Sequence, residues 1–105
     1  MNICILSGRV QRNAIVKGTE PKTLSFILEI SYGNNESEKK SNYLPCVLFN
    51  PTAEVEALLT TQGEGLQVEL EGRLSGSNPE INNGRKFGTE VIVRNRSLNI
   101  LQSGE

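Results

Sequence analysis

Two aromatic side chains, Tyr43 and Phe49, stand six positions apart in the stretch NYLPCVLFN. Because side chains alternate across a β-strand, an even separation places both rings on one face, about 20 Å apart at the rise of a strand. The opposite face takes Leu44, Cys46 and Leu48. One face can fill a protein core, so the face with the rings needs more protein, a second subunit or a ligand with flat apolar surfaces.

Lysine and arginine side chains occur before and after this stretch. They would complement the rings if the ligand also carried negative charge. The chain has 11 Lys and Arg against 12 acids, and its formal net charge is −1. Anions must therefore be held by a local patch rather than by the surface as a whole. The candidates for such a patch are Lys39, Lys40, Arg73, Arg85, Lys86, Arg9 and Arg12.

The residue types of most catalytic and metal sites are missing or dispersed. The chain has no His, every acid is Glu, and no glycine-rich phosphate-binding loop is present. The glutamates form no spaced pair on one element that would make an acid/base site. Cys4 and Cys46 each lie within an apolar run with no second ligand nearby, which is typical of buried, reduced thiols. An enzyme is therefore the least expected class, and neither a metal nor a cofactor is predicted.

The length of 105 residues fits a single domain, residues 1–105, that buries roughly 60 to 70% of the surface of its unfolded chain. The first residues, MNICILSG, are apolar but too few to span a membrane. They also lack the basic start and the cleavage site of a secretory signal. We therefore expect a cytoplasmic protein, associated with the nucleoid if it binds DNA, without a membrane partner.

Five strands are predicted from apolar runs and from alternation. TLSFILEISY alternates Leu24, Phe26 and Leu28 with mainly polar residues, the pattern of a half-buried strand. LQVELEGRL repeats this alternation as far as Gly72, where we predict a bulge or bend. The signal NNG at 82–84 predicts a tight turn before the last strand. The five predicted strands span residues 2–10, 23–32, 42–50, 66–74 and 86–101.

A helix of about ten residues is predicted between the third and fourth strands, near the mean length for globular proteins. We expect Asn50 as its N-cap, Pro51 at the first helical position and Gly63 at its end. One apolar stripe is formed by Val55, Leu58 and Leu59. The sequence therefore predicts an all-β protein, an OB-fold five-stranded Greek-key barrel with one short helix between strands three and four.

Several segments together resemble a known family. MNICILSGRV, LSFILEIS, YLPCVLFNPTAEVEALL, VELEGRL and FGTEVIV are similar, in this order and spacing, to the bacterial single-stranded DNA-binding protein (SSB) family. The resemblance covers nearly the whole chain, and EGRL followed by TEVIV is fairly specific. It implies an OB-fold that binds single-stranded DNA without marked sequence preference, usually as a homotetramer, in replication, recombination and repair.

The resemblance also implies site residues. By position, Tyr43 and Phe49 match the family aromatics at the start and end of the third strand, and Tyr32 is the ring closest to a third. The fourth family aromatic falls near Pro79 and is absent. Pro45 stands where the family often has a basic residue. We therefore expect these rings and the seven cations to bind single-stranded DNA weakly and with strong salt dependence.

Other interpretations of the same residues stay open. If the rings are structural, Phe49 packs against the helix and Tyr43 covers a barrel end. Glu69 and Glu71, on the polar side of the fourth strand, would repel phosphates if that face is used. The alternative function is a primosomal accessory protein, similar to primosomal replication protein N, or an OB-fold module that binds protein. The near-neutral charge and the absence of Trp favour it.

The first strand carries more apolar surface than one barrel core needs. An exposed edge there invites pairing with a second copy, and the resemblance implies a homodimer through this strand or a homotetramer. In the alternative, the helix or loops cover Ile3 and Ile5. The sequence ends at LQSGE without the Gly/Pro/Gln-rich linker and acidic tip of the family. Tail-mediated recruitment of repair enzymes is therefore not expected.

Overall fold

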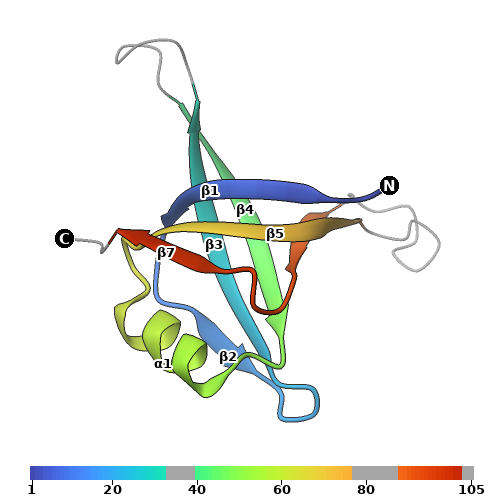
Figure 1. The fold of residues 1–105 in the computed structure, drawn as a ribbon, viewed down its shortest axis with the longest axis vertical. Helices are drawn as coiled ribbons and strands as arrows, with labels where there is room; N and C mark the ends of the chain where they lie inside the picture. The colour runs from blue at the N-terminus through green and yellow to red at the C-terminus, as the bar shows by residue number, and fades with distance from the viewer. Residues whose placement is uncertain (33–39, 77–87, 103–105) are drawn as a thin grey trace.

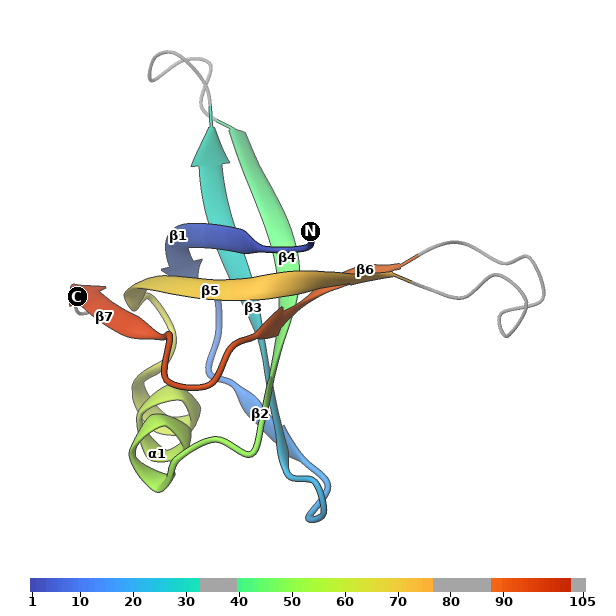
Figure 2. The ribbon, with the colours of Figure 1, turned by 45° about the vertical axis from the view of Figure 1, so that its right-hand side comes forward.

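Strands dominate the computed structural model, which describes residues 1–32, 40–76 and 88–102. The long strands arise where apolar and polar residues alternate, and the one helix among the described residues follows a Pro-Thr pair. Figures 1 and 2 show the elements crossing in two layers, with the helix beneath one end of the sheet. In chain order they are β1 (Cys4–Val10), β2 (Ile15–Lys17), β3 (Thr23–Tyr32), β4 (Lys40–Phe49), α1 (Ala53–Gln62), β5 (Gln67–Gly76), β6 (Thr89–Val93) and β7 (Asn99–Gln102).

Within the described residues, five strands close into a barrel in the order β1-β3-β4-β6-β5. The β1–β5 pairing closes the ring, with Leu6 opposite Leu70. The β4–β6 pairing is parallel, whereas the other barrel pairings are antiparallel. The helix lies between the third and fourth barrel strands of the chain. The predicted OB-fold architecture is therefore confirmed.

Two further strands were not predicted. The short strand β2 pairs with the start of β3, where Lys17 lies opposite Thr23. The predicted strand over 86–101 is in fact two strands, because a turn interrupts it after Arg94. In that turn Arg96 has a left-handed φ of 67°. The Ser97 hydroxyl donates to the Glu71 carbonyl oxygen at 2.9 Å and accepts from the Glu71 backbone N–H at 3.2 Å. The predicted turn at 82–84 lies outside the described residues.

The barrel interior holds one apolar core. The alternation of β3, β4 and β5 supplies most of it, as predicted. Leu59 of α1 closes one end of the core, and Val55 and Leu58 pack against it. The buried residues are Val10, Ala14, Leu24, Phe26, Leu28, Cys46, Leu48, Leu59, Leu66, Val68, Leu70, Val91 and Val93.

Both cysteines are free, as predicted. Cys46 is 1% exposed, and burial raises the pKa of its thiol to about 12. Cys4 is only half-buried and packs against the core from β1. The bulge considered at Gly72 is absent, because the pairing with both neighbouring strands runs through this residue without a shift in register. A Cβ at Gly72 would instead collide with the carbonyl oxygen of Ile92, so a close backbone approach explains the glycine.

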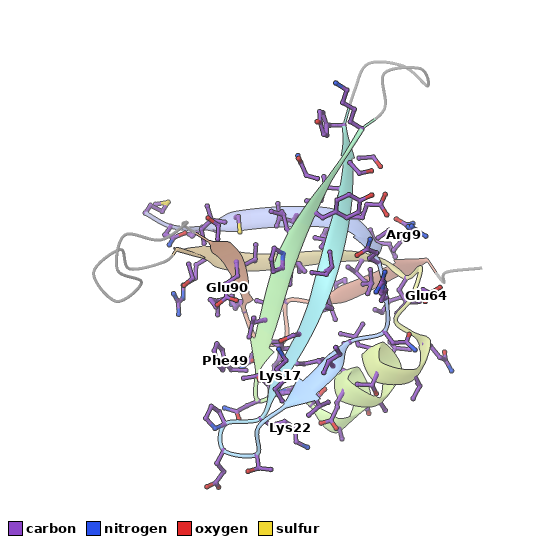
Figure 3. The ribbon with its side chains drawn as sticks, turned by 180° about the vertical axis from the view of Figure 1, so that it is seen from behind. Arg9, Lys17, Lys22, Phe49, Glu64 and Glu90 are labelled. Carbon is purple, nitrogen blue, oxygen red and sulfur yellow. The ribbon has the colours of Figure 1, made fainter. Side chains whose placement is uncertain are left out.

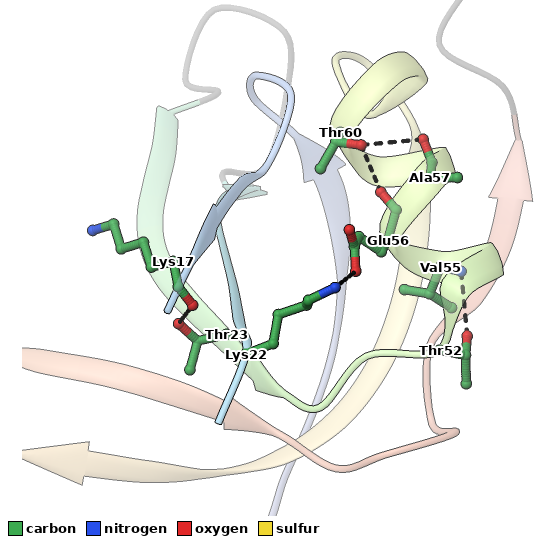
Figure 4. A network of polar contacts seen from close by, with 8 residues as sticks. All are labelled: Lys17, Lys22, Thr23, Thr52, Val55, Glu56, Ala57 and Thr60. Carbon is green, nitrogen blue, oxygen red and sulfur yellow. Dashed lines mark hydrogen bonds and ion pairs between the residues drawn. The ribbon is translucent and has the colours of Figure 1, made fainter. Parts of the chain in front are cut away.

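The helix begins later than expected. Its N-cap is Thr52, whose Oγ1 accepts a bond of 3.2 Å from the Val55 amide (Figure 4). Asn50 takes a left-handed φ of 53°, which Asn tolerates better than most residues. Its backbone N–H donates a hydrogen bond to the carbonyl oxygen of Lys22. Lys22 also reaches Glu56 of the helix at 3.0 Å, tying α1 to the start of β3. The predicted end at Gly63 is confirmed.

Candidate nucleic-acid interface

The outward residues of β4 are Tyr43, Pro45, Val47 and Phe49, which we call the β4 platform. The intervening Cys46 and Leu48 are buried and Leu44 is half-buried, so the predicted division of this strand into two faces is confirmed. Tyr43 is 54% exposed and Phe49 is 38% exposed. Figure 3 looks onto this side of the barrel and shows Phe49 projecting away from α1. The interpretation that the helix covers Phe49 is therefore wrong.

Outward residues of the neighbouring strands extend the β4 platform into a wider face, and we call this whole face the platform. On β3 the outward residues opposite it are, from Tyr43 to Phe49, Glu29, Ile27, Ser25 and Thr23. On the other side Val47 pairs with Ile92 of β6, and Ile92 pairs with Arg73 of β5. Successive rows lie about 7 Å apart along a strand. The two rings therefore stand at opposite ends of a broad face that spans several strands.

Arg9 lies at the Tyr43 end of this face but is already engaged. Its Nη2 and Nε donate to Glu29 Oε1 at 2.8 and 3.3 Å, and Ser41 donates to Oε2 at 2.8 Å. The hydrogen bond from Arg9, and after it that from Ser41, lowers the pKa of Glu29 from its ordinary value. The carboxylate is therefore ionised at neutral pH, and it offsets the charge of Arg9 next to Tyr43.

A groove of about 420 Å³ crosses the middle of the platform. One wall comes from the segment around β2 and carries Arg12, Ile15 and Lys17. Pro45 and Val47 also line it, and so does Glu90 of β6. Both cations are exposed, and no ion pair holds either within the described part of the chain. A flat apolar group lying on Pro45 and Val47 would have two cations beside it.

The remaining predicted site residues fall into three groups. Arg73 is exposed and shares the outward face of β5 with the platform. Tyr32 and Lys40 pair with each other, but alternation places both on the opposite face of the β3–β4 hairpin from Tyr43. The structure thus does not bring them together with the two platform rings. Lys39, Arg85 and Lys86 lie outside the described residues.

The acids that border the platform are not the ones expected. Glu69 and Glu71 lie opposite Ser7 and Ile5 of β1, on the other half of β5. Glu71 is also paired there with Arg94 at 2.5 Å. The acids on the platform are instead Glu29 and Glu90, which sequence reasoning did not select.

Lys17 and Ile15 were also missed, because a strand of three residues leaves too short a periodic signal. The alternation of exposed Ile15, half-buried Val16 and exposed Lys17 is visible only in the structure, because the residues Ile-Val-Lys do not alternate between apolar and polar. Glu90 left no clear signal either, because TEVIV places two polar residues before three apolar ones, and only its burial in the structure alternates, with both valines buried. The outward position of Glu90 follows from that alternation.

The free edge of β1 is the second exposed feature. Ile3 and Ile5 are 62% and 70% exposed, so the interpretation that the helix or loops cover them is wrong. Residues 4–9 pair with β5, whereas pairing with β3 begins only at Arg9. The Asn2 side-chain amide fixes the chain before β1 through two bonds of 2.8 Å with the Leu74 backbone. The other edge of β1, before Arg9, is thus unpaired within the described residues.

The described residues contain no group of three or more His, Cys, Asp or Glu side chains placed to hold a metal ion. No helix among them is long and apolar enough to cross a membrane.

Solved structures with the same fold were found. A Plasmodium falciparum SSB in complex with ssDNA has a TM-score of 0.75 at 21% identity, covering 97% of this chain and 96% of that one. The mitochondrial single-stranded DNA binding protein of S. cerevisiae has a TM-score of 0.73 at 12% identity, with 99% and 97% covered. The dimeric N-terminal domain of PriB from Thermoanaerobacter tencongensis has a TM-score of 0.63 at 24% identity, with 97% and 98% covered.

Sequence comparison identifies the family. The single-stranded DNA-binding protein of Lactiplantibacillus plantarum is 30% identical over 103 residues, which cover 93% of this chain and 50% of that protein. Single-stranded DNA-binding protein 3 of Streptococcus agalactiae is 26% identical, with 93% and 73% covered. The chain thus spans half the length of the first relative. Since the model of the single-strand binding protein family matches residues 1–99, the chain belongs to that family.

Proposed function

We propose that this chain binds single-stranded DNA without marked sequence preference, in replication, recombination or repair. Bases stack on Tyr43 and Phe49, and the phosphates follow the exposed cations Arg12, Lys17 and Arg73. The observation that carries the proposal is the exposure of two rings at the two ends of one outward face. Because the rings are about 20 Å apart, they serve different nucleotides of one strand. Membership of the family supports the same ligand.

The binding we propose is modest, and it depends less steeply on salt than the sequence predicted. A stacked base contributes about 1–3 kcal/mol, and this face offers two rings. The logarithm of the affinity falls with the logarithm of the salt concentration by about 0.7 for each phosphate neutralised on a single strand. Glu29 compensates Arg9, and Pro45 supplies no cation at the centre of β4. Few phosphates are therefore neutralised.

The test is the affinity of labelled oligodeoxythymidine for variants of the rings, measured by fluorescence anisotropy at low salt. Tyr43→Ala and Phe49→Ala should each weaken binding by about 1–3 kcal/mol while the fold is retained. Tyr32→Ala is the matched control, because Tyr32 is 49% exposed but lies on the other face of the hairpin. If the wild-type protein shows no affinity even at low salt, or if Tyr32→Ala weakens binding as much as the platform variants, the proposed site is rejected.

The proposal includes self-association and excludes catalysis. The unpaired edge of β1 with exposed Ile3 and Ile5 supports a homodimer through this strand, or a homotetramer built from such dimers. The residue inventory supports a binding protein rather than an enzyme. A protein that binds DNA in a bacterial cell works in the cytoplasm, at the nucleoid, and we place it there.

A second candidate is a primosomal accessory protein or an OB-fold module that binds protein. The specific observation in its favour is the charge of the platform, where Glu29 and Glu90 accompany the cations. The oligonucleotide titration separates the two candidates. Loss of binding in Tyr43→Ala with an intact fold favours the nucleic-acid function, and absence of binding by the wild-type protein favours the second candidate.

A further inference from the structure

Glu90 lies on the platform without a cationic partner. It directly precedes the buried Val91 and projects outward from β6, on the same face as Ile92. Its cross-strand neighbour on β5 is Ser75, and the parallel register sets it beside Pro45 of β4. Within the described part of the chain, no ion pair or hydrogen bond holds its carboxylate. The side chain of the half-buried Glu90 therefore lines the groove, and no described residue occupies its acceptor oxygens.

The groove is polarised from one wall to the other. Arg12 and Lys17 carry positive charge on the side of β2, and Glu90 carries negative charge on the side of β6. The strands β3 and β4 lie between β2 and β6, so the two charges occupy opposite sides (Figure 3 labels Lys17 and Glu90). Between them lie Pro45 and Val47, which are apolar.

This polarity fixes how a nucleotide can lie in the groove. A phosphate is attracted to Arg12 and Lys17 and repelled by Glu90, so the backbone follows the side of β2. The base then extends over Pro45 and Val47 and directs its edge toward Glu90. An ionised carboxylate only accepts hydrogen bonds, and it pairs with the amino group of cytosine but not with a carbonyl oxygen.

We propose that Glu90 accepts a hydrogen bond from the amino group of a base in this groove, so that the platform favours amino-bearing bases over thymine and uracil. The inference rests on the proposed binding of single-stranded DNA and adds a preference to it. Uracil is the informative competitor of cytosine, because the two rings have the same size and neither has a methyl group. Uracil presents carbonyl oxygens on both sides of its ring N–H, and these repel the carboxylate.

The experiment compares the dissociation constants of oligodeoxyuridine and oligodeoxycytidine of equal length, at one low salt concentration and at mildly alkaline pH, where cytosine is neutral. The dissociation constant of oligodeoxyuridine divided by that of oligodeoxycytidine should be well above one in the wild-type protein, because cytosine binds more tightly. In Glu90→Gln this ratio should fall by about tenfold, the size expected for one hydrogen bond to a charged acceptor. Glu69→Gln is the matched control, because it removes one exposed carboxylate from β5 outside the platform and should leave the ratio unchanged.

A second arm changes the ligand instead of the protein. Oligomers with N4,N4-dimethylcytosine lack the amino donors, and the wild-type protein should bind them about as weakly as oligodeoxyuridine. If Glu90→Gln strengthens binding of both oligomers equally, or if dimethylation changes nothing, Glu90 merely repels phosphate and the inference is overturned. If the wild-type protein binds neither oligomer, the proposed function itself fails, which is a different result from binding with an unaltered ratio.

Discussion

Arg9 and Glu29 form an ion pair with an Nη2–Oε1 distance of 2.8 Å, in the row of the sheet that also contains Tyr43. The pair leaves the Tyr43 end of the platform nearly neutral. A phosphate that approaches this end has to compete with the carboxylate for the guanidinium.

Glu29→Gln should therefore tighten binding of single-stranded DNA. Freed from the carboxylate, Arg9 can neutralise a phosphate, and the salt dependence should steepen by about 0.7 in the logarithmic slope. The measurement is anisotropy across a range of salt concentrations. Glu56→Gln is the matched control, because it releases Lys22 beside α1 rather than on the platform. An unchanged slope in Glu29→Gln, or the same gain in Glu29→Gln combined with Arg9→Gln, would contradict the role of Arg9.

The sequence predicts those parts of the fold that depend on local patterns. The alternation of Leu24, Phe26 and Leu28 is visible within ten residues, and so is the outward position of Tyr43. The ion pair of Arg9 could not be found in this way, because Glu29 lies on another strand and only the barrel register brings them together. The same holds for the isolation of Glu90 beside Pro45.

Turns and caps were predicted less well for a different reason. Asn50 and Thr52 are both favoured N-cap residues, and local sequence does not decide between them. The break after Arg94 depends on the Ser97 hydroxyl bonding the backbone of Glu71, a contact between distant parts of the chain. Tertiary contacts therefore settle the ends of the elements, whereas alternation settles their faces.

Thr52→Ala should destabilise the protein by about 1 kcal/mol, because it leaves the Val55 amide without its acceptor at the start of α1. For a domain of this size the corresponding fall in Tm is about 4–8 °C. Thermal unfolding followed by circular dichroism measures it. Thr52→Ser keeps the hydroxyl and should remain near the wild-type Tm. A Thr52→Ala variant as stable as the wild type would show that Thr52 is not the cap.

Cys46 should resist alkylation in the native protein. Burial raises its pKa to about 12, so the reactive thiolate is scarce at pH values where exposed thiols react. Since the folded state favours the neutral thiol, the associated stability is present below the ordinary pKa of 9.0 and is lost between that value and about 12. Iodoacetamide labelling with mass spectrometry should find Cys46 modified only in denaturant. Equal labelling rates in native and denatured protein would contradict its burial.

Ile5→Lys should weaken the self-association proposed at β1. The substitution places a charge on the exposed edge, where the apolar side chain would otherwise be covered by the second copy. The monomer should tolerate it, because Ile5 lies opposite Glu71 and a lysine there faces a carboxylate. Sedimentation velocity should show an assembly for the wild type and a shift toward the 11.5 kDa monomer for Ile5→Lys.

Ile15→Lys is the control, since Ile15 is similarly exposed but lies on β2, away from the edge. A wild-type protein that sediments only as a monomer would refute assembly through β1, and an equal loss of assembly in Ile15→Lys would move the interface to another surface.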